Sequence, residues 1–126
     1  MSRDKAEWLD KHFKKLAQAG MVFANPQAWF GSVAMAVPKK DTYRMVADYR
    51  AVNSLVAPSA MPMPNLEEIR RGMAGASVFC ILDLLQGYWR MALDPQAREI
   101  FTMVTTKGVY APTKVPQGVL NTTNYF

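Results

Sequence analysis

Apolar residues recur at helical spacing near the start of the chain. In RDKAEWLDKHFKKLAQAG, Leu9, Phe13 and Leu16 fall at positions i, i+4 and i+7, and charged residues cover the remaining positions. Gly20 suits the C-terminal stop of such a helix. The pattern predicts an amphipathic helix, and the lysines of this stretch are most simply its solvated face.

Short apolar runs then predict two hairpins. VAMAVP and YRMVAD bracket the turn KKDT, so the first hairpin carries positive charge at its tip. IFTMVT and VYAPTKV bracket Thr106-Lys107-Gly108 and predict the second hairpin. The stretch FANPQAWFGS, which precedes the first hairpin, is typical of a loop.

Further helices are predicted between and after the hairpins. The three prolines of APSAMPMPN require an extended segment, and Asn65 then suits the N-cap of a helix, with Glu68 placed for a capping box. Asp94-Pro95 is expected to begin a short helical turn. The last nine residues, GVLNTTNYF, start with a glycine and are expected to begin another helix after it. Together these elements predict an α+β fold.

One apolar run carries an acid. VFCILDLLQGYWRMAL, residues 78–93, predicts a buried strand in which Asp83 is the only charge before Arg90. An unpaired buried carboxylate costs several kcal/mol, so Asp83 needs either a metal ion or another partner. Without further context, a helix cap or a satisfied acid at a strand end explains Asp83 as well as a metal ligand does.

Length and composition narrow the class of protein. The 126 residues make one domain or less, and a composition half hydrophobic and one fifth charged suits a folded chain. No apolar run reaches the length of a membrane span, and the charged N-terminus lacks the apolar region of a signal peptide, so we expect an intracellular protein without a membrane partner. One cysteine, Cys80, excludes disulfides and thiolate metal sites, and one histidine, His12, leaves a histidine-based metal site or triad too few members.

The net charge of +5 mildly favours polyanionic partners. Nine of the 15 basic residues lie within residues 1–50, including a cluster at the first hairpin. Lys39, Lys40 and Arg44 of this cluster can neutralise a triphosphate, or they can simply be a solvated turn.

Around Asp83 the residue types suit nucleotidyl transfer by two metal ions, which requires carboxylates that hold two cations about 4 Å apart. Gly87, next to Gln86, permits a close backbone approach to phosphate oxygens. Taken alone, Tyr88 is more often a core residue, and Gln117-Gly118 is no more than a turn signal.

Five blocks, taken in order, resemble the reverse transcriptases of long-terminal-repeat retrotransposons, most closely the gypsy-like group. The opening helix with AGMVFANPQAW and VAMAVPKK resembles the entry into the fingers of that family. YRMVADYRAVN resembles its W/Y-R and D-Y-R-x-x-N stretch, and MPMPNLEEI its Y-P-x-P segment and following helix. ILDLLQGYWRMAL resembles the palm strand with the first catalytic aspartate, and VPQGVLNTTNYF the P-x-G-x-x-N-x-x-x-x-F element.

The resemblance implies roles for single residues. Asp83 would be the first catalytic, metal-binding aspartate, the carbonyl of Leu84 a further metal ligand, and Tyr88 the steric gate against a ribose 2′-OH. Gln117 would lie near the incoming sugar. Template-strand and structural roles in the fingers are implied for Asp48, Tyr49, Arg50 and Asn53.

The same resemblance implies a triphosphate site. Gln86 and Gly87 would lie under the triphosphate through their backbone N–H groups, and Arg44 would grip the β- and γ-phosphates together with Lys39 or Lys40. The stretch PKKDTYR lacks the glycine usual in the family motif K-K-D-G-x-W-R, so the choice between the two lysines stays open.

The family implies two Mg²⁺ ions (or Mn²⁺), an RNA or DNA template-primer, and deoxynucleoside triphosphates. We expect an α+β piece of a right-hand polymerase, with fingers over about 1–77 and the start of the palm over about 78–126. The Y/F-x-D-D motif is absent, and Thr123 stands where the family usually has proline. We therefore expect a fragment without its remaining palm, connection and RNase H parts, inactive alone, in a cytoplasmic particle or the nucleus. The alternatives are a non-catalytic nucleic-acid-binding remnant and an unrelated basic α+β module.

Overall fold

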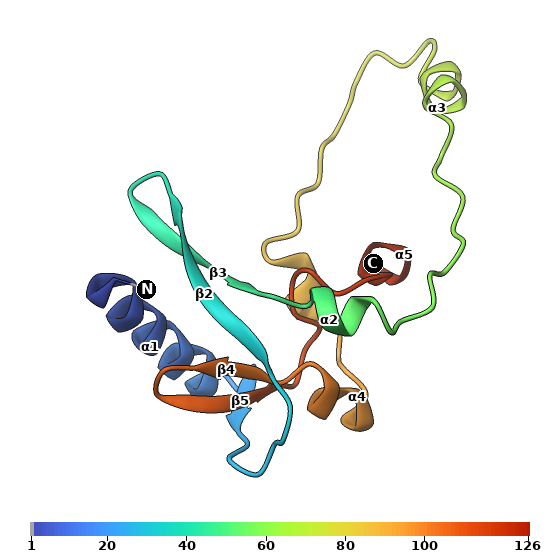
Figure 1. Cartoon of the computed structure of the whole chain (residues 1–126). Helices are drawn as coiled ribbons and strands as arrows, with labels where there is room; N and C mark the ends of the chain where they lie inside the picture. The colour runs from blue at the N-terminus through green and yellow to red at the C-terminus, as the bar shows by residue number, and fades with distance from the viewer. Residues whose placement is uncertain (1) are drawn as a thin grey trace.

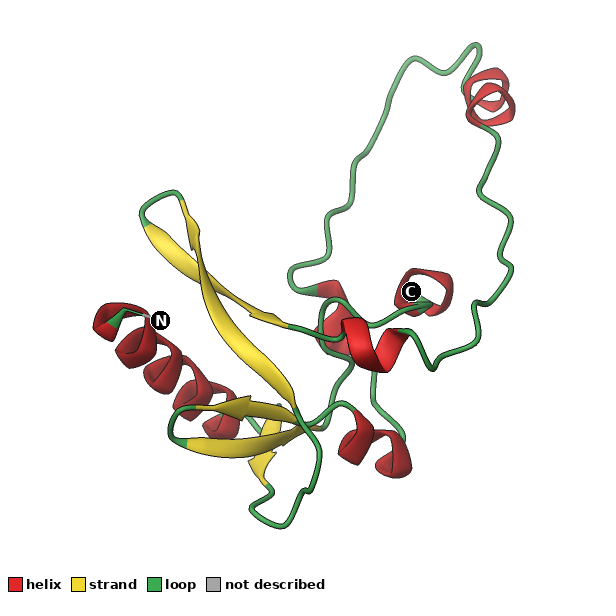
Figure 2. Cartoon of the chain, in the orientation of Figure 1, coloured by secondary structure: helices red, strands yellow, loops and turns green. Residues whose placement is uncertain are grey.

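The computed structural model, which describes residues 2–126, contains a five-stranded sheet beside helix α1, Arg3–Gln18 (Figure 1). The strand order is β1-β5-β4-β2-β3. The strands are β1 Val22–Ala24, β2 Ser32–Lys39, β3 Thr42–Ala47, β4 Met103–Thr105 and β5 Gly108–Pro112. The α+β class is confirmed, since helices and this mixed sheet make up the structure (Figure 2).

Both predicted hairpins form. β2 and β3 pair antiparallel up to Lys39 opposite Thr42, and β4 pairs antiparallel with β5 up to Thr105 opposite Gly108. A short parallel pairing of β2 with β4, at Ser32–Met103 and Val33–Val104, joins the two hairpins into one sheet. The loop prediction for residues 23–32 was wrong at its start, because β1 pairs with β5 and gives the backbone of residues 22–24 its hydrogen-bond partners.

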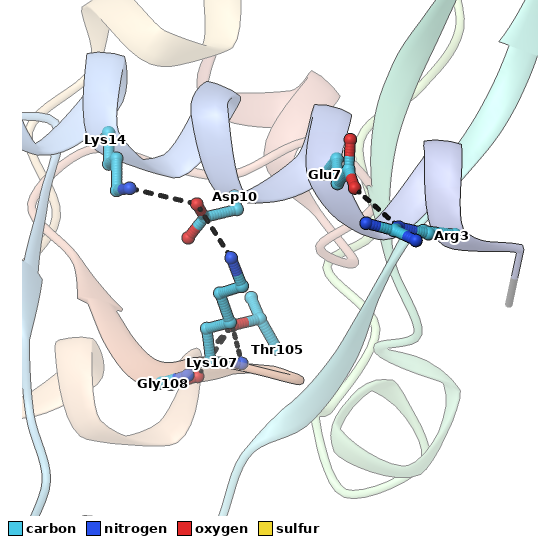
Figure 3. A network of polar contacts seen from close by, with 7 residues as sticks. All are labelled: Arg3, Glu7, Asp10, Lys14, Thr105, Lys107 and Gly108. Atoms are coloured by element: carbon cyan, nitrogen blue, oxygen red, sulfur yellow. Dashed lines mark hydrogen bonds and ion pairs between the residues drawn. The ribbon is translucent and has the colours of Figure 1, made fainter.

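Helix α1, Arg3–Gln18, packs on this sheet as the apolar spacing predicted. Leu9 and Phe13 are fully buried, and Gly20 ends the helix in the left-handed region at φ +69°. On the same helix the Asp10 carboxylate accepts bonds from the Lys14 ammonium at 3.0 Å and the Lys107 ammonium at 3.3 Å (Figure 3). The second contact ties α1 to the turn between β4 and β5, and both lysines hold the pKa of Asp10 below its ordinary value.

The remaining helices are short. They are α2 Arg50–Asn53, α3 Leu66–Gly72, the 3-10 helix η1 Gly87–Arg90, α4 Pro95–Ile100 and α5 Thr122–Tyr125. The predicted caps of two of them are present: Asn65 accepts from the Glu67 N–H at 3.0 Å, and Asp94 accepts from the Gln96 N–H at 2.9 Å. None of the helices within residues 2–126 has the length and apolar character that a bilayer crossing needs.

The predicted buried strand around Asp83 is wrong. Residues 76–84 form no strand. They belong to an exposed loop segment that, together with α3, extends away from the sheet (Figure 1). Ile81 and Leu82 are 93% and 87% exposed, and Cys80 is exposed as well. An extended segment becomes a strand only where a second strand accepts its hydrogen bonds, and no segment within residues 2–126 pairs with this one.

Candidate functional site

A cavity of about 490 Å³ lies between the β2–β3 hairpin and the turn that begins η1. It brings together six of the seven residues that the sequence predicted to bind a nucleotide, although these residues come from three distant parts of the chain. The six are Lys39, Arg44, Gln86, Gly87, Tyr88 and Gln117. None of the lining residues carries a carboxylate, so the cavity complements an anion.

The hairpin supplies the positive charge. Lys39 lies opposite Thr42, and Arg44 lies opposite Val37, so both basic side chains project from the same face of the hairpin. Lys40 lies in the two-residue turn with φ +47°, is exposed, and does not line the cavity. Of the two lysines, Lys39 lines the cavity and Lys40 does not.

The turn before η1 is held in an unusual backbone conformation. Gln86 has φ +52°, a left-handed value that costs a non-glycine residue on the order of 1 kcal/mol. Gly87 follows, and a Cβ on it would lie 2.3 Å from Cζ of Phe126, which is shorter than any real contact. A side chain at this position would therefore require the Phe126 ring to move.

Tyr88 and Gly87 line both the large cavity and a smaller one of about 230 Å³. The Tyr88 ring meets the Phe126 ring edge-on, with centroids 5.3 Å apart. Its hydroxyl lies 3.3 Å from Oγ1 of Thr123, the residue that replaces the usual family proline. The start of α5 at Thr122 shows that the helix forms without that proline.

Asp83 and Leu84 line the smaller cavity, which shares Gly87 and Tyr88 with the cavity that Lys39 and Arg44 line. The Asp83 carboxylate is exposed and forms no hydrogen bond or ion pair within residues 2–126, so it is neither a helix cap nor a satisfied acid there. No cluster of three or more potential metal-ligating side chains occurs in that range. One carboxylate and one carbonyl do not suffice to hold two divalent cations, so these residues alone do not fit the two-ion centre.

Helix α1 provides a part of the cavity wall that the sequence patterns did not predict. Trp8 and His12 stack with centroids 4.8 Å apart and an interplanar angle of 9°, and Trp8 also contacts Tyr43. Burial and then the nearby Lys15 lower the pKa of His12, which favours the neutral form of its ring. The spacing of four residues on one helix face was the available signal. The other lining residues not predicted are Thr42, Met45 and Trp89.

The four residues of the D-Y-R-x-x-N match lie outside the cavity and have structural contacts. The Tyr49 hydroxyl donates to the Phe101 carbonyl at 2.9 Å, and burial raises the pKa of Tyr49. The Arg50 guanidinium binds both carboxylate oxygens of Asp48, at 2.8 and 2.6 Å, and lowers the pKa of Asp48 to about 2. Asn53 contacts the loop that follows Gln117.

Solved structures with a similar fold cover nearly the whole chain. The foamy viral protease-reverse transcriptase in complex with dsDNA matches with a TM-score of 0.80 and 23% identity, over 100% of this chain and 26% of that one. The native prototype foamy virus protease-reverse transcriptase matches with a TM-score of 0.75 and 24% identity, over 97% and 16% of the two chains. At this identity the likeness shows the fold, which is shared with part of a polymerase.

Two curated relatives are retrotransposon polyproteins. The retrovirus-related Pol polyprotein from transposon 412 of Drosophila melanogaster is 31% identical over 77% of this chain, and the transposon Tf2-3 polyprotein of Schizosaccharomyces pombe is 30% identical over 73%. The chain spans 8% and 7% of the lengths of these relatives. The family described as reverse transcriptase (RNA-dependent DNA polymerase) matches residues 37–126, more than two thirds of the chain. The chain therefore belongs to the reverse transcriptase family.

Proposed function

We propose that residues 2–126 form the nucleotide-binding part of an RNA-directed DNA polymerase, and that the 490 Å³ cavity receives the triphosphate of an incoming deoxynucleotide. One observation carries this proposal. Two basic side chains line a cavity without acids, and Asp83 lines a second cavity that shares Gly87 and Tyr88 with the first. A triphosphate needs cations around its phosphates and a carboxylate site next to its reacting phosphorus.

Each side of the cavity has a role in this proposal. Arg44 offers two parallel N–H donors to phosphate oxygens, and Lys39 adds a second positive charge. Gln86 and Gly87 approach the phosphates with backbone groups, and Gln117 lies near the sugar. Tyr88 lines both cavities, and in this proposal its ring would exclude a ribose 2′-OH.

Asp83 contributes one ligand to the divalent metal ions in this proposal, with magnesium as the expected ion. The proposal requires further carboxylates from elsewhere in the polymerase, because one acid cannot hold two ions. The template-primer duplex is the proposed nucleic-acid partner, and the complex of the foamy viral relative with dsDNA supports this.

The test is primer extension by a polymerase that contains these residues, with Arg44→Ala and a matched control, Arg70→Ala, on the exposed helix α3. Loss of hydrogen bonds to a charged group is worth roughly 1.5–3 kcal/mol, so kcat/KM for the deoxynucleotide should fall about 10- to 150-fold in Arg44→Ala. Arg44→Lys should be intermediate, since it keeps the charge and loses the paired donors.

Equal activity of Arg44→Ala and Arg70→Ala would overturn the triphosphate assignment. Absence of nucleotide addition by the unmodified polymerase, together with nucleic-acid binding that weakens steeply with salt, would favour the binding remnant instead.

A further inference from the structure

We infer that Asn53 is a positioning residue that fixes Gln117 in the nucleotide cavity. The effect of Asn53 on nucleotide binding rests on the proposed function, because Gln117 lines that cavity and Asn53 does not. Asn53 acts on Gln117 through the loop that follows it.

The amide of Asn53 makes two hydrogen bonds to main-chain atoms of this loop. Its Nδ2 donates to the carbonyl of Gly118 at 2.9 Å, and its Oδ1 accepts from the N–H of Leu120 at 2.9 Å. These bonds span 65 and 67 residues of sequence. Only an amide side chain provides a donor and an acceptor side by side, so neither aspartate nor alanine can make both bonds.

The loop needs this support because of its own backbone. Gly118 has φ +99°, which is accessible to glycine alone without strain, and a free glycine samples many conformations. Gln117 is exposed and immediately precedes Gly118. The local backbone alone therefore does not fix the direction in which the Gln117 side chain points. The two hydrogen bonds from Asn53 hold Gly118 and Leu120 in place. We infer that they thereby set the direction in which the Gln117 side chain points.

Asn53 itself is fixed to the core. It ends α2, and its backbone N–H donates to the carbonyl of Tyr49 at 2.7 Å. Tyr49 is 2% exposed, and its hydroxyl is bonded to the carbonyl of Phe101. A continuous series of contacts therefore connects the buried core, through α2 and the Asn53 amide, to the position of Gln117.

A double-mutant cycle in a polymerase that contains these residues tests the inference. Asn53→Ala should raise the KM for the deoxynucleotide about tenfold with kcat changed less than threefold. In a Gln117→Ala background the same change should raise KM less than twofold, because the residue that Asn53 positions is gone. A tenfold rise in both backgrounds would overturn the inference, since Asn53 would then act independently of Gln117.

Asn124→Ala is the matched control. The Asn124 Nδ2 donates to the Ser59 carbonyl at 2.9 Å, so this variant loses a similar bond without touching residues 117–120. Its KM should stay within twofold of the unmodified polymerase. A tenfold rise in Asn124→Ala would overturn the assignment, because loss of any such bond would then have the same effect.

Amide hydrogen exchange separates failure of this inference from failure of the proposed function. The Leu120 N–H should exchange at least tenfold faster in Asn53→Ala than in Asn124→Ala, whether or not the protein adds nucleotides. Unchanged exchange at Leu120 would overturn the clamp itself. An unmodified polymerase that adds no nucleotide would overturn the proposed function and, with it, the role of Asn53 in nucleotide binding.

Discussion

Lys39 and Lys40 are sequence neighbours, but the structure predicts opposite outcomes for their removal. Lys39 is the last residue of β2 and lines the cavity, whereas Lys40 lies in the turn with φ +47° and does not. We compare Lys39→Ala with Lys40→Gly, because glycine removes the second charge and accepts the left-handed backbone of the turn.

The expected magnitudes follow from these positions. A hydrogen bond to a charged group is worth roughly 1.5–3 kcal/mol, and the exposure of Lys39 places its bond to a phosphate at the low end of that range. Lys39→Ala should therefore lower kcat/KM for the deoxynucleotide about tenfold, at 1.4 kcal/mol per factor of ten. Lys40→Gly should change kcat/KM less than twofold, and it should stabilise the protein by about 1 kcal/mol because the strained turn residue is gone.

Steady-state primer extension at several deoxynucleotide concentrations measures kcat/KM for both variants. Urea unfolding measures the stability of Lys40→Gly. Both variants lose one positive charge from the same hairpin, so a general electrostatic effect on nucleic-acid binding would lower their activities equally. A loss in Lys40→Gly as large as that in Lys39→Ala would refute the reasoning from the geometry of the hairpin.

Three further predictions follow from the site and its support. Tyr88→Val should raise the use of ribonucleotides relative to deoxynucleotides at least tenfold in single-nucleotide incorporation, and an unchanged ratio would mean that Tyr88 only packs against Phe126. Asp83→Asn should reduce primer extension at least a hundredfold without lowering the thermal midpoint, because its carboxylate has no partner within residues 2–126; near-normal extension would refute a catalytic role. Tyr49→Phe should lower the free energy of unfolding in urea by about 1–2 kcal/mol, since it leaves the buried Phe101 carbonyl without its donor, and should leave the KM for the deoxynucleotide unchanged.

Local patterns in the sequence were enough to predict most of the elements. The spacing of Leu9 and Phe13 predicted α1, and the caps Asn65 and Asp94 predicted the starts of α3 and α4. The two hairpins followed from alternating runs around short turns. Each of these features depends on interactions between residues a few positions apart, so the local sequence is enough to predict it.

The ordered motifs also predicted residues that meet at one cavity. Six of the seven proposed nucleotide-binding residues do line one cavity, although their motifs lie up to 78 positions apart. The family match over residues 37–126 agrees with that order. The roles of these residues in binding and catalysis stay predictions.

How the elements combine depends on contacts between segments that are far apart in the sequence. The parallel pairing of β2 with β4 joins segments about 70 residues apart, and no local pattern indicates which strands will meet. The composition of the apolar run around Asp83 favours a strand, but no strand forms there, because no segment within residues 2–126 pairs with its backbone. The choice of Lys39 over Lys40, the wall that α1 contributes and the Asn53 clamp likewise depend on contacts between distant segments. Side-chain periodicity determines an element locally, whereas pairing, burial and cavity walls are set by what folds against it.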